Sequence, residues 1–219
     1  MANYLIIGGH GKIALLTAPL LTREGHIVTS VIRNPDQTAD VEAAGAKALV
    51  LDVENASQDE LADAFAGQDA IVWSAGAGGG NPDRTYAVDR DAAIRSMDAA
   101  EQAGVKRYVM VSYQGASTQH GVPEDNSFFP YAEAKGAADE HLRNSGLDWT
   151  ILGPGKLTLN EPSGRIAVGS GAGEAGLRDT SRGNVAQAIR VALETESSMG
   201  QQIEFVDGDE PIVAAFAQL

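Results

Sequence analysis

The sequence contains no cysteine, and this absence excludes disulfide bonds, thiolate metal sites and cysteine nucleophiles. Only 4 histidines occur, and they are scattered along the chain, which argues against a zinc site built from histidine. We therefore expect no metal site.

Long hydrophobic runs are also missing. No stretch of 18 apolar residues occurs, and such a stretch is what a membrane-spanning helix needs. The N-terminal segment has no basic leader, and its apolar run stops at Ile7, unlike a secretion signal. We expect a soluble, cytoplasmic protein that does not act at a membrane.

Positive charge is scarce in this chain. Its 16 lysines and arginines are outnumbered by 30 aspartates and glutamates, and the formal net charge is −14. Nucleic acids and anionic membranes are bound through positively charged surfaces. The composition therefore argues against both as the main partner, and a small molecule is the expected ligand.

The 219 residues, 43% of them hydrophobic, suffice for one sizeable core and are few for two full domains. Short apolar runs alternate with longer amphipathic segments, a pattern typical of a parallel sheet with helices on both faces. The expected strands are Tyr4–Ile7, Ile27–Ile32, Ala48–Leu51, Ala70–Trp73, Tyr108–Val111, Trp149–Leu152 and Ile203–Val206. The expected helices are about Lys12–Arg23, Asp36–Ala44, Gln58–Ala66, Thr85–Ala103, Tyr131–Asn144 and Arg182–Thr195. We expect a single α/β domain over residues 1–219.

Two glycine-rich stretches, Gly76–Gly80 and Gly164–Gly176, are predicted to be surface loops. Both follow predicted strands. They are either flexible connections or the rim of a ligand site, because open α/β sheets bind ligands at the carboxyl ends of their strands.

A glycine-rich turn joins the first strand to the first helix. Gly8 allows a tight turn, Gly11 allows a diphosphate to approach the backbone, and Ala14 lets the helix pack closely on the strand. The helix N-terminus then offers free N–H groups to the phosphates. The residues expected to contact the diphosphate are Gly8, His10, Gly11, Lys12 and Ile13. A plain tight turn is the alternative, but the position between strand and helix favours a nucleotide.

The second strand is followed by Arg33. An acidic residue at this place binds the ribose 2′-hydroxyl of NAD, and a basic one accommodates the 2′-phosphate of NADP. No carboxylate occurs before Asp36, so the sequence favours NADP, with NAD still open. The alternative is that Arg33 is only a solvated cation.

Two further strands end in residues suited to the same ligand. Asp52 and Val53 follow the third strand and are expected at the adenine. Ser74, Ala75 and Gly76 follow the fourth strand and are small enough for a cofactor to pass close to the backbone. Together with the first turn they predict strand ends arranged around one dinucleotide.

Tyr131 and Lys135 are four residues apart, which places them on one face of a helix. The pKa of tyrosine is near 10, and a nearby cation lowers it toward values useful for proton transfer to an oxygen that undergoes hydride transfer. Ser112, at the end of the fifth strand, is the candidate for a hydrogen bond to the same oxygen; Ser117 and Thr118 are weaker candidates. The alternative is an exposed pair on a solvated helix.

The chain from Asn3 to about Val206 resembles the short-chain dehydrogenase/reductase superfamily. It is most similar to the atypical branch of NmrA-like proteins and biliverdin-IXβ and flavin reductases. The segments that carry this resemblance are Gly8–Gly11, Val31–Pro35, Ala103–Ser112, Tyr131–Lys135 and Gly146–Gly155.

The resemblance implies a three-layer Rossmann fold with strand order 3-2-1-4-5-6-7 and the dinucleotide at the switch point of the sheet. It implies Tyr131 as general acid/base, Lys135 as a ribose ligand that also tunes the tyrosine, and Ser112 as the carbonyl anchor. Gly153, Pro154 and Gly155 would lie near the nicotinamide. Relatives usually carry arginine where this chain has Gly153.

A short remainder of the chain follows, with a small rim segment at about 153–181 and little room for a separate substrate domain. We therefore expect an NADPH-dependent reductase that transfers a hydride to a small carbonyl, quinone or flavin-like acceptor, as a monomer or homodimer. The alternatives are a non-catalytic, NmrA-like sensor of NADP(H) and an NAD-dependent epimerase or dehydratase.

Overall fold

The computed structural model describes residues 1–78, 80–169 and 179–219. Its strands are β1 (Asn3–Ile7), β2 (Ile27–Ile32), β3 (Lys47–Val50), β4 (Ala70–Trp73), β5 (Arg107–Val111), β6 (Asp148–Pro154), β7 (Lys156–Thr158), β8 (Arg165–Val168), β9 (Asp179–Ser181), β10 (Gln201–Asp207) and β11 (Glu210–Pro211). In the described residues, nine of them form one sheet in the order β11-β8-β10-β6-β5-β4-β1-β2-β3. The pairs from β3 to β10 are parallel, whereas β8 is antiparallel to both β10 and β11.

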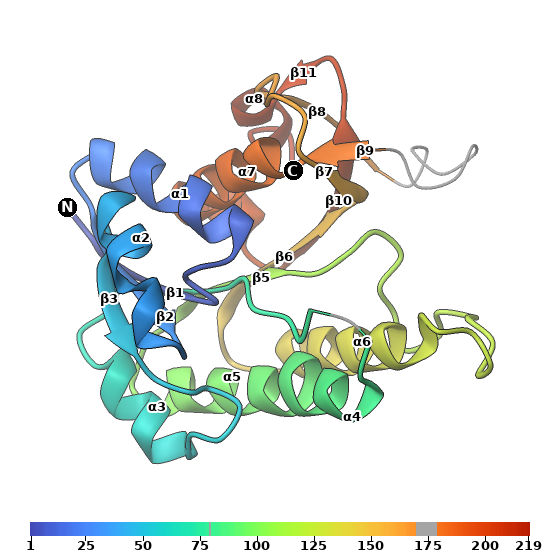
Figure 1. Cartoon of the computed structure of the whole chain (residues 1–219). Helices are drawn as coiled ribbons and strands as arrows, with labels where there is room; N and C mark the ends of the chain where they lie inside the picture. The colour runs from blue at the N-terminus through green and yellow to red at the C-terminus, as the bar shows by residue number, and fades with distance from the viewer. Residues whose placement is uncertain (79, 170–178) are drawn as a thin grey trace.

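Helices cover both faces of the sheet (Figure 1). One face carries α1 (Lys12–Arg23), α2 (Thr38–Ala43), α7 (Arg182–Glu194) and α8 (Ile212–Phe216), and the other carries α3 (Gln58–Phe65), α5 (Ala93–Gln102) and α6 (Phe129–Arg143). The apolar side chains of each strand alternate between the two cores, as in Ile6 and Ile7. This arrangement is the three-layer, doubly wound fold that the sequence predicts.

The seven predicted strands all form and keep the predicted order, with β10 as the seventh. The sheet is larger than expected because β8 and β11 extend it beyond β10. The prediction of a loop is wrong for Arg165–Val168, since these residues pair with β10 and β11 and bury Ile166. The rest of that stretch, from 170 to 178, lies outside the described residues, as does Gly79 in the first glycine-rich stretch.

The helix predicted at Thr85–Ala103 is divided into three parts. A short α4 (Pro82–Thr85) leads into a π-helical segment, η2 (Tyr86–Ala92), and then into α5. The wider π-helical turn brings the Asp89 side chain back toward the preceding loop, where its Oδ2 accepts the Ala77 N–H at 3.0 Å. Such turns are often found at functional sites.

A second, two-stranded parallel sheet is formed by β7 and β9. It lies beyond the carboxyl end of β6 and places Leu157 and the start of α7 beside the strand ends of the main sheet. Ser181 caps α7, since its side chain accepts the Asn184 N–H.

One buried cation fastens α7 to the sheet. Arg107 at the start of β5 is 7% exposed. Its guanidinium donates to Thr150 Oγ1 at 2.6 Å, to the Ala192 carbonyl at 2.8 Å and to Ser198 Oγ at 3.1 Å. Burial lowers its pKa to about 10, so it is still charged at neutral pH.

We expect Arg107→Ala to lower the free energy of unfolding by about 3 kcal/mol or more, because several buried acceptors lose a charged donor at once. The measurement is the urea midpoint by circular dichroism. Lys106→Ala is the matched control, because Lys106 is the exposed neighbour on the same strand end. Equal midpoints for the two variants would contradict this role of Arg107.

Candidate functional site

A pocket opens at the carboxyl ends of β1 to β4. Gly8, Arg33, Asp52 and Ser74 each follow one of these strands and meet there. Of the residues expected at the dinucleotide, it is lined by Gly8, His10, Gly11, Arg33, Asp52, Val53, Ser74, Ala75 and Gly76. The structure thus brings together residues that lie far apart in the sequence.

The turn after β1 has a geometry that only glycine satisfies. Gly8 has a φ of +83°, and a Cβ on it would lie 2.7 Å from Cα of Ala75. A Cβ on Gly9 would lie 2.4 Å from Cβ of Ser30, so this glycine is needed for packing on β2, a role that the spacing of the motif did not reveal. Gly11 precedes α1 with an ordinary φ of −64°. Gly11 lines both pockets at the N-terminus of α1, which makes a cradle of the kind that a diphosphate fills.

Arg33 lies at the edge of this pocket with a second cation that sequence reasoning missed. Glu54 Oε2 lies 3.2 Å from Nε of Arg84 and 3.9 Å from Nη1 of Arg33. Arg84 also donates to the Ala77 carbonyl at 2.9 Å. The group therefore offers two guanidinium groups to a 2′-phosphate, and one carboxylate that could accept a ribose hydroxyl. Glu54 follows β3 and Arg84 follows β4, so no spacing in the sequence indicates that the two side chains meet.

His10 turns away from the diphosphate cradle toward α2. Its Nε2 lies 2.8 Å from Oδ2 of Asp40. The pair fixes the imidazole at the rim of the pocket, so His10 is positioned by a residue from the next crossover.

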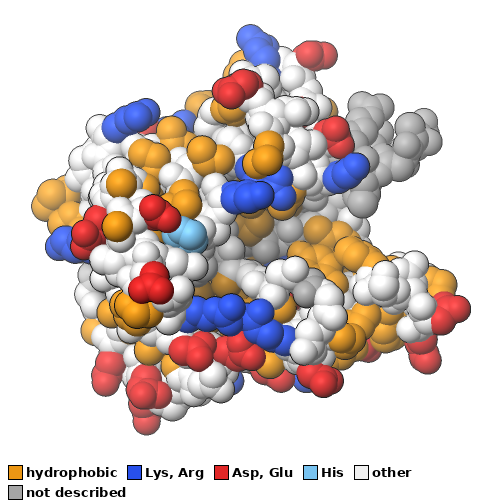
Figure 2. Space-filling view, viewed as in Figure 1, with side chains coloured by type: hydrophobic (Ala, Val, Ile, Leu, Met, Phe, Trp, Pro, Cys, Tyr) orange, Lys and Arg blue, Asp and Glu red, His pale blue; other side chains and the backbone are white. Residues whose placement is uncertain are grey.

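A second pocket continues from the first across the loop after β4. It is lined by Lys12 and Ile13 at one end and by Tyr131 and Ser112 at the other, with Ser74, Ala75 and Gly76 shared between the two pockets. It also contains residues that sequence reasoning missed, namely Asp89, Leu157 and Arg182. Figure 2 shows the hollow on this face, with Lys and Arg side chains gathered on both of its sides.

Tyr131 lies in the first turn of α6, packed beside two other rings. Its ring centroid is 5.5 Å from that of Tyr113 and 5.4 Å from that of Phe128. Burial of the phenol raises its pKa above the ordinary value, and the nearby carboxylate of Asp89 raises it further. This direction is opposite to the one expected from the Tyr131–Lys135 spacing, because the Lys135 ammonium is directed at the Val111 carbonyl and Met110.

Lys135 is buried below the tyrosine, with 1% of its surface exposed. Its Nζ donates to the Val111 carbonyl at 2.9 Å and to Sδ of Met110 at 3.2 Å. It does not line either pocket in the described part of the chain, so its expected contact with a ribose is still a prediction.

Ser112 reaches the pocket directly after β5. Its hydroxyl donates to Oδ2 of Asp139, a buried carboxyl one turn beyond Lys135 on α6. The structure thus gives the predicted serine a partner that the sequence pattern did not indicate.

Gly153, Pro154 and Gly155 are buried at the end of β6, paired with β10, and neither pocket is lined by them among the described residues. A Cβ on Gly153 would lie 3.2 Å from the Tyr113 carbonyl oxygen. An arginine here would press on the segment that carries Tyr113, which gives a physical reason for the glycine. Contact with a nicotinamide remains a prediction for all three.

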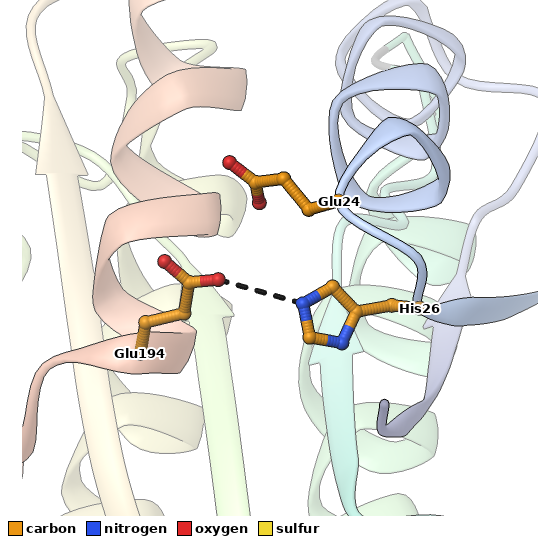
Figure 3. A group of neighbouring side chains, drawn as sticks. All are labelled: Glu24, His26 and Glu194. Carbon is orange, nitrogen blue, oxygen red and sulfur yellow. Dashed lines mark ion pairs between the residues drawn. The ribbon is translucent and has the colours of Figure 1, made fainter.

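A group of possible metal ligands lies away from this site, between the ends of α1 and α7. Glu24, His26 and Glu194 point toward one another (Figure 3). However, Arg190 lies 2.9 Å from Glu24 and 3.4 Å from Glu194, and the Ala2 N–H donates to Nδ1 of His26. The His26 proton is then on Nε2, which faces Glu194 at 3.5 Å. The group is an ion-pair network that joins two helices.

The chain matches the family model described as NAD(P)H-binding over residues 8–196. This match covers both pockets and most of the sheet. In the described residues, no helix has the length and apolar character needed to cross a membrane.

Two curated proteins are similar along nearly their whole length. A Schizosaccharomyces pombe protein, UPF0659 protein C216.03, is 34% identical, covering 99% of this chain and 94% of its own. The protein YhfK of Bacillus subtilis, described as an uncharacterized sugar epimerase, is 35% identical, with 98% of each chain covered.

Solved structures share the fold. A Bacillus halodurans protein described as a candidate NAD-dependent epimerase/dehydratase superposes with a TM-score of 0.90 at 32% identity, with 100% of both chains covered. The oxidoreductase YlbE of Lactococcus lactis gives a TM-score of 0.86 at 28% identity, covering 99% of this chain and 96% of its own. ChuY of Escherichia coli, described as an anaerobilin reductase, gives a TM-score of 0.76 at 22% identity, covering 94% of this chain and 98% of its own. At this identity the likeness shows the fold alone.

Proposed function

This chain belongs to the NAD(P)H-binding family, and we propose that it is a reductase that uses NADPH to reduce a small carbonyl, quinone or flavin-like acceptor. The observation that carries the proposal is the continuity of the two pockets. One hollow runs from the glycine turn after β1 to Tyr131 and Ser112. Such a hollow can hold a dinucleotide with its reactive end beside a phenol.

The residues fit this coenzyme. The Gly8–Gly11 turn and the N-terminus of α1 would hold the diphosphate, with Asp52 and Val53 at the adenine. NADPH, when bound, supplies the hydride. The protein's own residues would place the acceptor oxygen between Tyr131 and Ser112, hold it by hydrogen bonds and supply its proton.

Tyr131 carries its proton at neutral pH, as a phenol of ordinary pKa does, and burial raises this pKa further. A protonated phenol can donate to an oxygen that gains negative charge as a carbonyl is reduced. This protonation state favours reduction over the reverse reaction, in which Tyr131 would have to accept a proton.

The proposal is tested by following NADPH consumption with a panel of aldehydes, quinones and flavins. Oxidation of NADPH with at least one acceptor supports it. Tight coenzyme binding without turnover would favour the sensor instead. Interconversion of sugar epimers without net coenzyme consumption would favour the epimerase, the activity in the name of the Bacillus subtilis relative.

We expect tighter binding of NADP(H) than of NAD(H), because Arg33 and Arg84 both lie at the end of the pocket where a 2′-phosphate would bind. Arg33→Ala and Arg84→Ala should each weaken NADP(H) binding about tenfold, the effect of one charge-assisted hydrogen bond, and leave NAD(H) binding nearly unchanged. Isothermal titration of both coenzymes measures this. Arg90→Ala is the control, since Arg90 pairs with Asp91 on η2. Equal affinities of the wild type for the two coenzymes would contradict the preference.

A further inference from the structure

A cluster of charged groups lies buried beneath the second pocket. Lys135 and Asp139 of α6 are 1% and 0% exposed, and Asp89 of η2 is 2% exposed. Ser112 joins the cluster to the pocket, because it lines the pocket and donates to Asp139. The cluster therefore places two carboxyl groups and one ammonium in a region with little water.

The charges of this cluster do not balance if every group is ionised. Lys135 donates to the Val111 carbonyl and to Met110, and no hydrogen bond joins it to either carboxyl group among the described residues. Arg143 also faces Asp139 from the same helix, but it is paired with Glu140 at 2.7 Å. Arg84 of α4 faces Asp89, but it is paired with Glu54 at 3.2 Å. Two buried carboxylates beside one ammonium leave a negative charge without compensation, and such a charge is costly.

Other titratable groups near Asp139 do not supply positive charge. Tyr113 and Tyr131 are neutral phenols there, and burial raises the pKa of both. A proton on one of the two carboxyl groups leaves one carboxylate with one ammonium, and the cluster is then neutral.

The hydrogen bonds indicate which carboxyl group holds the proton. Asp89 accepts the Ala77 N–H and borders the pocket. Asp139 accepts only from Ser112, and its Oδ1 is buried without a partner in the described residues. A buried oxygen without a partner is less costly on a neutral carboxyl group than on a carboxylate. Burial raises the pKa of both groups, which agrees with this assignment.

The protonation state of Asp139 decides what Ser112 can do. A carboxylate only accepts hydrogen bonds, so an ionised Asp139 occupies the single hydroxyl hydrogen of Ser112. A neutral Asp139 can donate its own hydrogen to Oγ of Ser112. The hydroxyl hydrogen of Ser112 is then free to point into the pocket.

We propose that Asp139 is a positioning residue that keeps a proton at neutral pH and thereby turns the Ser112 hydroxyl into a donor toward the substrate oxygen. The role toward substrate rests on the reductase function proposed above. The protonated state of Asp139 does not, because it follows from the protein's own residues.

The test is an NMR pH titration of the whole protein, in which the side-chain carboxyl carbon of every aspartate is labelled with ¹³C. The titration runs from mildly acidic to mildly alkaline pH. We expect one signal with the chemical shift of a protonated carboxyl group at neutral pH. It should be missing from Asp139→Asn and present in the control Asp98→Asn, whose carboxylate pairs with His141 of α6. If the signal missing from Asp139→Asn is that of a carboxylate at neutral pH, the proposal is overturned.

A second variant assigns the signal if Asp139→Asn does not fold. Ser112→Ala keeps Asp139 but removes the hydroxyl that donates to its ionised form, and this charge-assisted hydrogen bond is stronger than the one that the neutral form makes. The signal of Asp139 should therefore titrate at higher pH in Ser112→Ala. An unchanged titration of every aspartate would count against the proposal.

The pH profile separates positioning from a purely structural role. With phenanthrenequinone as acceptor, the rate of NADPH oxidation should fall about 100-fold as pH rises through the pKa found by NMR, because the oxygen loses a donor. In Asp139→Asn the side-chain amide donates to Ser112 at every pH, so this fall should disappear. The same fall in both proteins would overturn the positioning role. Absence of any quinone reduction would count against the reductase function, while the NMR result would still decide whether Asp139 is protonated.

Discussion

Gly11→Val should weaken coenzyme binding at least about 100-fold, or about 2.8 kcal/mol, while the protein stays folded. The φ of Gly11 is −64°, which any residue adopts, and a Cβ there meets its nearest atom, the Gly8 carbonyl oxygen, at 3.0 Å. The added side chain would occupy the space through which a diphosphate reaches the N-terminus of α1. Fluorescence titration with NADPH measures the affinity, and thermal unfolding reports stability.

Gly25→Asn is the matched control for this variant. Gly25 lies just beyond the other end of α1, its φ is +86°, and a Cβ there meets nothing within 4 Å. Asparagine tolerates such a φ better than most residues do, so both affinity and stability should change little. Unimpaired NADPH binding by Gly11→Val would show that the glycine turn is not the diphosphate site.

Tyr131→Phe should lower the rate of acceptor reduction by about 10²–10⁴-fold, the usual contribution of a positioned general acid. NADPH affinity should change little, because the variant removes one hydroxyl group at the far end of the hollow. Single-turnover measurement of NADPH oxidation separates the two quantities.

The control for this variant is Tyr86→Phe. Tyr86 lies on η2, and its hydroxyl donates to Glu133 at the surface, away from Ser112. Loss of this hydrogen bond should leave the rate nearly unchanged. If Tyr131→Phe turns over as fast as the wild type, Tyr131 is not the proton donor.

The raised pKa of Tyr131 determines how the rates of reduction and oxidation should change with pH. The phenol stays protonated across the neutral range, so ionisation of Tyr131 should not slow reduction there. Oxidation of an alcohol by NADP⁺ needs the phenolate and should become faster as pH rises. A lowered pKa, as the Tyr131–Lys135 spacing predicts, would instead make reduction slow as pH rises within the neutral range.

Local sequence patterns were sufficient for most of the fold. Continuous apolar runs such as Ala70–Trp73 predict strands because both faces of a parallel strand are buried. The turn at Gly8–Gly11 was recognisable because strand, glycines and helix follow one another without interruption. The strand at Arg165–Val168 was missed because the glycines around it indicate a loop, while its stability comes from pairing with β10.

The candidate site likewise contains residues that the sequence identified and residues that it did not. Tyr131, Ser112 and Arg33 were identifiable because each occupies a recognisable place on its own helix or strand. Their partners were not, because Asp139, Asp89 and Arg84 act through contacts between different elements.

The sequence by itself determined the layers of the fold, the order of its strands and the glycine turn that would hold a coenzyme, since these depend on neighbours along the chain. The tertiary structure alone decided the direction of the Tyr131 pKa shift and the partners of Ser112 and Lys135. The physical reason is that a pKa depends on burial and on nearby charges, and both are set by segments that meet only after folding.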